Sequence, residues 1–352
     1  MKKVSVVVPC FNASMYLPKC MDKLLDQTIG LENMEIILVD DASTDSGQTW
    51  SVITDYERRY PESIIAIHLE ENLRQGGARN VGVSYASGEF LLFCDADDWL
   101  MEEALERLYR TAVEQNADVV ECLYKYVYDH NEEVKEIETG GGYSNELFDL
   151  DAEGYRKHFL IEPMWRNDIT YGSQRKLYRT SLIKEHNIRF VEHLIFEEPS
   201  FVVPTRLYAH KWYFLNEVLY IYYLSPGSSM RSDLSDRKWD NPKVWLHLLQ
   251  ELKERKALNK YFKEIEYMFV HWYMILTLQM WTRRGYTIEV SDLQQLQDTV
   301  LHFFPRAVQN SYLIEKGQTG VWSGLAIKLL QIQICDESVA MVNQLLRQYL
   351  GL

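Results

Sequence analysis

Residues 89–98 are Glu-Phe-Leu-Leu-Phe-Cys-Asp-Ala-Asp-Asp, an apolar run that ends in a cluster of aspartates. An apolar run of this length predicts a buried strand. Asp95, Ala96, Asp97 and Asp98 follow at its carboxyl end, where open α/β sheets bind their ligands. Carboxylates held so close together repel one another, and a hard divalent cation relieves the repulsion. We therefore predict that Asp95, Asp97 and Asp98 hold Mn²⁺ or Mg²⁺.

The same carboxylates have a simpler structural explanation. Asp97 or Asp98 could cap a helix predicted to begin near Met101, because aspartate side chains accept hydrogen bonds from the first backbone amides of a helix. Taken alone, the motif does not decide between a cap and a metal site. The rest of the N-terminal sequence favours the metal site.

The first 130 residues alternate apolar runs with amphipathic stretches, which is the pattern of a sheet flanked by helices. The first strand is expected to end at Pro9, and Gly76 and Gly77 are expected to form a turn before a helix of small residues. Besides the strand above, the predicted strands are residues 4–8, 35–39 and 63–69. The predicted helices are residues 17–28, 78–86, 102–113 and one that begins near Ser46.

A second acidic turn follows the strand at residues 35–39, with Asp40, Asp41, Ser43 and Asp45 in quick succession. Such a turn can accept hydrogen bonds from a nucleobase and from ribose hydroxyls. Arg79 lies at a predicted helix start, where a guanidinium and free backbone amides favour an anion such as a diphosphate. The alternative for Arg79 is a structural ion pair with one of the aspartates.

Four segments of the chain carry a resemblance to a known family. In chain order they are Val4–Asn12, Val39–Asp45, Asn72–Gly82 and Ala86–Asp98. Together they resemble the successive motifs of family 2 glycosyltransferases of the GT-A fold, of the kind that build bacterial surface polysaccharides. The resemblance implies a Rossmann-like mixed α/β sheet flanked by helices, a nucleotide-sugar donor that is commonly UDP-linked, and inversion at the anomeric carbon.

The resemblance also implies roles for individual residues. In the family, the pair that matches Asp40 and Asp41 contacts the base, and the cluster that matches Asp95 to Asp98 contacts ribose, diphosphate and metal. The strand end that matches Pro9 to Asn12 lines the same nucleotide site. We therefore expect the donor to be bound by these residues and by Ser43, Arg79 and Ala96.

Inversion requires a general base that takes the proton from the acceptor hydroxyl. The stretch Phe196-Glu-Glu-Pro-Ser-Phe201 resembles the acceptor-side motif of the family, which has a Glu-Asp pair. Here the pair is Glu197 and Glu198, and Glu198 matches the position of the aspartate base. The alternative is an exposed helix start with Pro199 in its first turn.

Other features narrow the function. The chain has no Gln-x-x-Arg-Trp motif, which marks processive relatives, so we expect transfer of one sugar at a time to a glycan or lipid-linked saccharide acceptor. Trp165, Arg166 and His193 are candidate acceptor contacts, and the tyrosines of Tyr220–Met230 either stack on the acceptor or pack in the core. The different class of function left open is a catalytically degenerate nucleotide-sugar-binding partner subunit.

The composition predicts which partners the protein avoids and where in the cell it acts. The formal net charge is −14, which opposes binding to nucleic acid. Five scattered cysteines without metal spacing predict reduced, buried thiols of a cytoplasmic protein, which we expect at the inner face of the plasma membrane if its acceptor is lipid-linked. The apolar run from Tyr267 to Trp281 is too short for a membrane span and predicts a buried or interfacial helix.

We expect two domains. Residues 1–230 form the catalytic domain, with a nucleotide-sugar half at 1–130 and an acceptor half at 131–230, and residues 236–352 form an α-helical domain. The tryptophans of these helices predict either core packing or a contact surface, for the membrane periphery or for a homo-oligomer.

Overall fold

The computed structural model describes residues 2–130, 133–139, 144–152, 154–161, 171–224, 235–318 and 320–352. The chain separates into two compact units, Met1–Ser232 and Asp233–Leu352, which we call the N-terminal unit and the C-terminal unit. The domain boundary expected from the sequence lies between residues 230 and 236. Each unit is described by itself.

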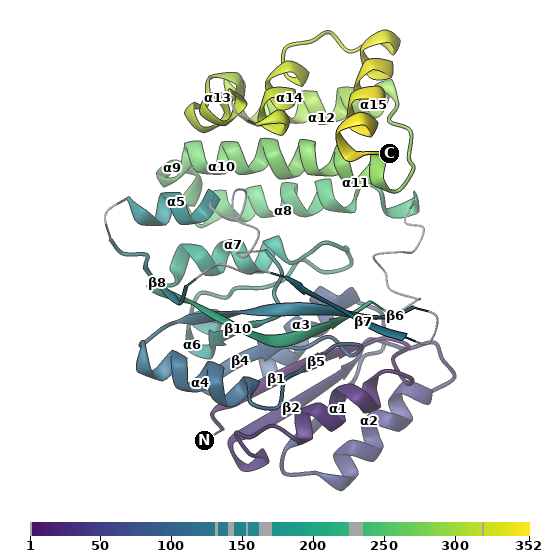
Figure 1. The fold of residues 1–352 in the computed structure, drawn as a ribbon, viewed down its shortest axis with the longest axis vertical. Helices are drawn as coiled ribbons and strands as arrows, with labels where there is room; N and C mark the ends of the chain where they lie inside the picture. The colour runs from purple at the N-terminus through teal and green to yellow at the C-terminus, as the bar shows by residue number, and fades with distance from the viewer. Residues whose placement is uncertain are drawn as a thin grey trace. The chain divides into compact units, whose positions relative to one another are not determined.

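The N-terminal unit is built on one mixed sheet in the order β3-β2-β1-β4-β9-β6-β10-β5, with β7 beside β6 and β8 beside β10 (Figure 1). Strands β3, β2, β1 and β4 are parallel, whereas β9 is antiparallel to both of its neighbours. The strands are β1 (Val4–Cys10), β2 (Met34–Asp40), β3 (Ile64–His68), β4 (Phe90–Phe93), β5 (Trp99–Leu100), β6 (Val119–His130), β7 (Glu133–Thr139), β8 (Glu146–Asp149), β9 (Lys176–Arg179) and β10 (Lys211–Tyr223). The expected mixed α/β fold is confirmed.

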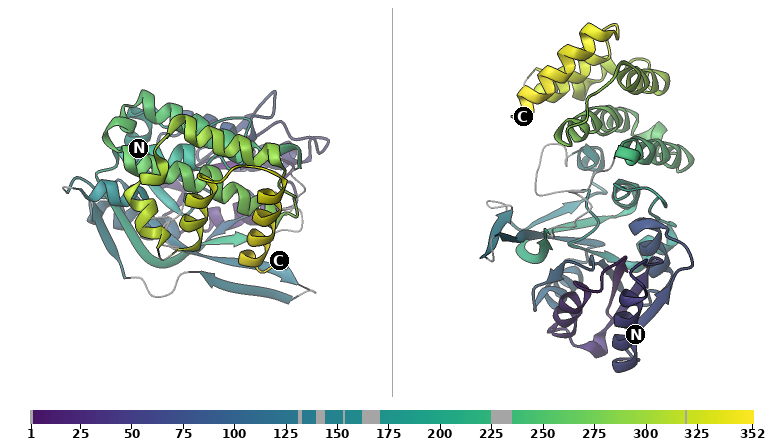
Figure 2. Two further views of the ribbon diagram at one scale, coloured as in Figure 1. Left: turned by 90° about the horizontal axis from the view of Figure 1, so that it is seen from above. Right: turned by 90° about the vertical axis from the view of Figure 1, so that its right-hand side faces the viewer.

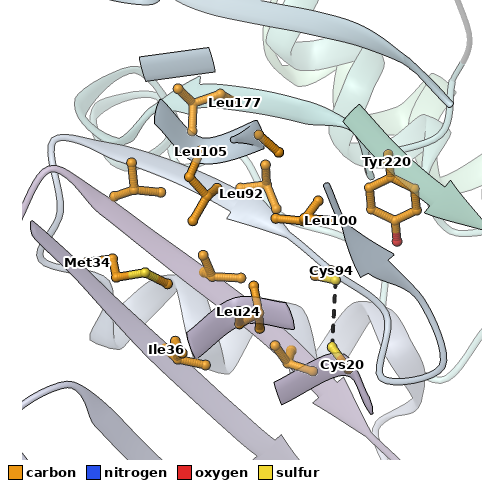
Figure 3. Packing of buried hydrophobic residues seen from close by; sticks show 14 of the residues in the cluster. Cys20, Leu24, Met34, Ile36, Leu92, Cys94, Leu100, Leu105, Leu177 and Tyr220 are labelled. Carbon is orange, nitrogen blue, oxygen red and sulfur yellow. Dashed lines mark hydrogen bonds between the residues drawn. The ribbon is translucent and has the colours of Figure 1, made fainter. Parts of the chain in front are cut away.

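Helices cover both faces of this sheet (Figure 2). Alternate residues of a strand face opposite sides, so Val6 of β1 packs into the core with α1, α2 and α4, while Val7 faces Gly82 of α3. Figure 3 shows the core on the side of Val6, where Leu24 of α1, Leu92 of β4 and Leu105 of α4 pack together. The helices are α1 (Leu17–Leu25), η1 (Leu31–Asn33), α2 (Gln48–Arg59), α3 (Arg74–Tyr85), α4 (Ala104–Glu114), α5 (Tyr155–Ile161), α6 (Thr180–Glu185) and α7 (Pro199–Tyr208).

Strand β1 continues through Pro9, so the expectation that Pro9 ends it is wrong. Pro9 is paired in register with Val39 of β2, whereas pairing with β4 on the other side stops at Val7. Proline lacks an amide hydrogen and is tolerated where a strand has an open side. The last residues of β1 are not paired with β4, so Pro9 is tolerated there. The strand therefore continues to Cys10, which pairs with Asp40 at the end of β2.

Gly76 and Gly77 lie in the first turns of α3 rather than in a turn before it. A Cβ atom on Gly76 would lie 2.6 Å from the backbone oxygen of Val191 and 2.8 Å from Cγ of Glu197. The glycine is therefore explained by close approach between α3 and the segment that carries Glu197. The sequence pattern suggested a turn because glycine serves both purposes.

The C-terminal unit is helical. Its elements are η3 (Ser235–Arg237), α8 (Asp240–Glu254), α9 (Ala257–Lys260), α10 (Phe262–Phe269), the π-helix η4 (Val270–Leu276), α11 (Thr277–Arg283), α12 (Val290–Phe303), η5 (Ala307–Gln309), α13 (Ser311–Gly317), α14 (Val321–Leu329) and α15 (Asp336–Leu350). Tyr267 and Trp281 are buried, as are most residues between them, so the run they bound is a core helix. Among the residues that the structure describes, no helix has the length and apolar character needed to cross a membrane.

The cysteines are free thiols, as expected. Cys10, Cys20, Cys94 and Cys122 are buried, and Cys335 is partly exposed. Cys20 and Cys94 lie side by side under the sheet, with their sulfur atoms 3.8 Å apart (Figure 3).

Candidate active site

Asp98 is held by strand β10. Its Oδ2 accepts a hydrogen bond from the Tyr220 hydroxyl at 2.5 Å, and its Oδ1 accepts one from the Tyr223 amide at 2.9 Å. Helix α4 begins at Ala104 with Glu103 at its N-cap, so the alternative that Asp97 or Asp98 caps this helix is wrong. Burial, and then the charges of Asp95 and Asp97, raise the pKa of Asp98 well above its usual range.

Arg79 joins the two sides of the site. Its fully buried guanidinium donates to Glu197 Oε1 at 2.5 Å and to Asp95 Oδ1 at 2.7 Å. Burial lowers the pKa of this guanidinium, but the charges of Asp95 and then Glu197 outweigh it and raise the pKa overall. The structure therefore shows the ion pair that was the alternative for Arg79, and this burial does not support the expected diphosphate contact.

A short segment before β9 connects the same groups, and no pattern in the sequence pointed to it. The Ser173 amide donates to Glu198 Oε1 at 3.3 Å, and Gln174 Nε2 donates to Asp95 Oδ2 at 2.7 Å. The Arg175 guanidinium lies 4.8 Å from the centre of the Tyr124 ring. Residues 173–175 therefore link the predicted base, an aspartate of the predicted donor site and an aromatic side chain of β6.

Glu198 is the N-cap residue of α7, and Pro199 occupies the first turn of that helix. The side chain of Glu198 makes no capping hydrogen bond and is only partly exposed. Burial, and then the neighbouring charge of Glu197, raise its pKa to about 7. Glu197 itself is 2% exposed, so the pair is not an exposed helix start. A carboxyl group with this pKa can exchange a proton at neutral pH.

The segments that follow β1 and β2 meet through Asn12 and Ser43. The backbone amide of Asn12 donates to Ser43 Oγ at 2.9 Å, and the Ser43 hydroxyl donates to Asp40 Oδ1 at 2.5 Å. The other oxygen of Asp40 lies 2.8 Å from Nδ1 of His68, a partner that the sequence did not suggest. Three of the residues predicted to bind the nucleotide are thus in one hydrogen-bonded group.

Asp41 lies beside this group and faces the start of α3. Its Oδ1 accepts a hydrogen bond from the Leu73 amide at 2.7 Å, and burial raises its pKa to about 6. Asp45 accepts hydrogen bonds from the amide and hydroxyl of Thr49 in α2. Asp45 therefore supports the helix, which leaves Asp40 and Asp41 as the acidic pair of the turn.

The remaining predicted residues differ in exposure. Pro9 and Ala96 are buried. His193 is exposed, with its amide bonded to the Leu73 carbonyl at 2.9 Å. Trp165, Arg166 and residues 225–230 lie outside the described residues.

A cation would be held by fewer aspartates than predicted. Among the described residues, no three His, Cys, Asp or Glu side chains are arranged to hold a metal ion. Both carboxylate oxygens of Asp95 and both of Asp98 accept hydrogen bonds from protein donors. Asp97 lies between them in sequence and is partly exposed. This arrangement fits Mg²⁺-type binding, in which one or two carboxylates and the substrate phosphates hold the ion.

A mixed sheet flanked by helices, with acidic loops at the ends of its parallel strands, is the arrangement of the GT-A fold. The family model described as Glycosyl transferase family 2 matches residues 5–184. GlyG, a glycosyltransferase of Streptococcus pneumoniae serotype 4, is 32% identical over 245 residues, which are 67% of this chain and 75% of GlyG. This chain belongs to glycosyl transferase family 2.

Two further comparisons describe its relatives. The poly(ribitol-phosphate) beta-glucosyltransferase of Bacillus spizizenii is 31% identical over 198 residues, 54% of this chain and 27% of that protein. The chain spans 34% of another match, GlyA of S. pneumoniae, so these two relatives are much longer. The crystal structure of S. aureus TarS 1-349 with UDP has a TM-score of 0.66 and 20% identity, covering 99% of this chain and 91% of that one. That likeness shows the fold.

Proposed function

We propose that this chain is a non-processive, inverting glycosyltransferase that moves a sugar from a UDP-sugar to a glycan or lipid-linked glycan acceptor in cell-surface polysaccharide synthesis. The observation that carries the proposal is Glu198, whose pKa of about 7 suits a general base at neutral pH. It lies next to the Glu197–Arg79–Asp95 ion pairs that lead to the predicted donor site. We place the reaction at the cytoplasmic face of the membrane when the acceptor is lipid-linked.

The chemical step follows from these positions. Glu198 takes the proton of the acceptor hydroxyl while the hydroxyl oxygen attacks the anomeric carbon of the donor sugar. The bond from that carbon to the diphosphate breaks, and the nucleoside diphosphate leaves with the electron pair. Attack from the face opposite the leaving group inverts the anomeric carbon.

The donor is assigned to the acidic turn and its neighbours. Asp40 is fixed by Ser43, and Asp41 by the Leu73 amide, so both carboxylates are preorganised acceptors at the ends of parallel strands. A uracil ring offers an N–H donor and ribose offers hydroxyl donors to such groups. The structure of TarS was solved with UDP, which supports a uridine donor here.

A divalent cation would be held by Asp97, the partly exposed aspartate of the cluster, and by the phosphates of the donor. When bound, Mn²⁺ or Mg²⁺ neutralises the charge that develops on the leaving diphosphate. Asp98 is assigned a different task, because Tyr220 and Tyr223 occupy its two oxygens. It holds the turn of residues 95–98 against β10.

The sharpest test is Glu198→Gln, which keeps the size of the side chain and removes the base. General-base catalysis contributes about 10²- to 10⁴-fold, so transfer should fall by at least about 100-fold while UDP affinity stays unchanged. Glu185→Gln is the matched control, because Glu185 is exposed at the end of α6. Turnover near that of the wild type in Glu198→Gln would remove Glu198 as the base, and no turnover by the wild type with any UDP-sugar would favour the degenerate-subunit alternative.

A further inference from the structure

Strands β6 and β10 present tyrosines on one face of the sheet, next to the turn of residues 95–98. The strands pair in parallel with Tyr220 beside Tyr124 and Tyr222 beside Tyr126. Residues two apart in a strand point to the same side, so these four side chains share a face. Tyr220 is buried and bonded to Asp98, whereas the other three are partly exposed.

Tyr124, Tyr126 and Tyr222, which we call the tyrosine cluster, hold one another edge to face. The ring centres of Tyr124 and Tyr126 are 5.2 Å apart at 83°, and those of Tyr126 and Tyr222 are 5.3 Å apart at 77°. The hydroxyls of Tyr124 and Tyr126 lie 3.5 Å apart. Such packing fixes the rings with little freedom left, which suits a preformed binding surface.

The tyrosine cluster adjoins both sides of the proposed site. Tyr222 is two residues from Tyr220, whose hydroxyl bonds to Asp98, so its side chain lies on the same face of the strand as that contact. At the other end of the cluster, Arg175 lies over Tyr124, and the two residues before Arg175 bond to Asp95 and Glu198. The rings therefore border the place where an acceptor hydroxyl must lie.

We propose that the tyrosine cluster binds a neutral sugar ring of the acceptor, an inference that rests on the proposed function. A pyranose has a face of C–H groups that packs on aromatic rings and a rim of hydroxyls that can bond to tyrosine hydroxyls.

Charge argues against the other acceptor chemistry found among the relatives' names, a polyol-phosphate chain. Asp97 and Glu198 are the partly exposed carboxylates of the site, and the chain as a whole carries a net charge of −14. Like charges placed opposite each other across an interface disfavour binding. A polyanion would meet this field, whereas a neutral saccharide would not.

The test is calorimetric titration of the chain, saturated with UDP and Mn²⁺, with a panel of neutral disaccharides and with a ribitol-phosphate oligomer. Tyr222→Leu removes the ring and should weaken binding of the best disaccharide by about tenfold, whereas Tyr222→Phe should keep most of it. Affinity for UDP should stay unchanged in both. Tyr213→Leu is the matched control, because Tyr213 is a partly buried tyrosine of the same strand, nine residues before Tyr222.

The outcomes separate the two levels of the argument. Equal disaccharide affinity in Tyr222→Leu and Tyr213→Leu, or binding of the ribitol-phosphate oligomer alone, would overturn the inference about the tyrosine cluster. Failure of the wild type to bind UDP or to transfer from any UDP-sugar would instead overturn the proposed function. If Tyr222→Leu loses its fold, Tyr126→Leu serves as the second variant with the same expected loss.

Discussion

Replacement of Arg79 by methionine removes the cation that lies between Asp95 and Glu197. Methionine retains the apolar bulk of the side chain but leaves both carboxylates without this partner. Arg79 is fully buried, and its two hydrogen bonds to the carboxylates measure 2.5 and 2.7 Å. The variant thus tests whether this ion pair network holds the N-terminal unit together.

The expected cost follows from burial. Removal of one partner from a buried ion pair costs about 3–5 kcal/mol, because a charge remains without compensation in a low dielectric. In a folded unit of this size, each kcal/mol lowers the thermal midpoint by about 2–4 °C. Arg79→Met should therefore lower the midpoint of the N-terminal unit by about 6–20 °C. Addition of Glu197→Gln should restore part of the loss, because it neutralises one of the stranded carboxylates.

Differential scanning calorimetry measures these midpoints, with the transition of the N-terminal unit assigned by its shift on UDP binding. Arg58→Met is the control, because the Arg58 side chain is 80% exposed and its pair with Asp55 is on the surface. Exposed pairs contribute about 0–1 kcal/mol, so this variant should shift the midpoint by less than about 4 °C. A loss in Arg79→Met no larger than in Arg58→Met, or a further loss on adding Glu197→Gln, would refute the reasoning.

Other outcomes test single features of the site. The rate of transfer should rise with pH through about 7, because only deprotonated Glu198 can take a proton; a flat pH–rate profile across that range would contradict its role. Burial raises the pKa of Asp41 to about 6 in the folded chain, so folded Asp41 binds its proton more tightly than unfolded Asp41, and the stability this gives is lost as pH rises through about 6. Asp41→Asn should remove that pH-dependent loss in urea titrations while weakening UDP binding, and an unchanged pH dependence would refute the assignment. Gly76→Ala should cost about 1–3 kcal/mol in urea unfolding because its Cβ would meet the Val191 carbonyl oxygen, unlike Gly324→Ala, where the nearest contact is 3.4 Å.

The sequence predicted the first four strands because each is a local pattern. Residues 4–8, 35–39, 63–69 and 89–94 are short apolar runs with polar residues at their ends, and parallel strands bring those ends to one edge. Asn12 and Ser43, which the family resemblance assigned to one nucleotide site, are joined by a hydrogen bond at that edge. Boundaries were less secure, as Pro9 and the two glycines of α3 show, because the same residue type serves a turn or a close contact.

The second half of the sheet and its contacts could not be predicted in the same way. Arg79 and Glu197 are 118 residues apart, and Tyr220 and Asp98 are 122 apart. No local periodicity encodes such a pairing, and a carboxylate in a turn looks the same in the sequence whether it binds a ligand or a tyrosine. The partners of Asp95 and Glu198 at residues 173–175 were missed for that reason.

The long-range contacts also bear on why a glutamate can stand at the base position. Arg79 lowers the pKa of Glu198, and acting alone it would hold that carboxyl ionised and weakly basic. Its charge is instead divided between Asp95 and Glu197, and the charge of Glu197 raises the pKa of Glu198. Burial raises the pKa of Glu198 more than Glu197 does, and together they bring it to about 7. Glu198 occupies the N-cap position of α7, and its Oε1 accepts a hydrogen bond from the Ser173 amide. Burial, and then the charge of Glu197, therefore give the proposed base a pKa suited to proton transfer at neutral pH, and a glutamate at this position is compatible with general-base catalysis.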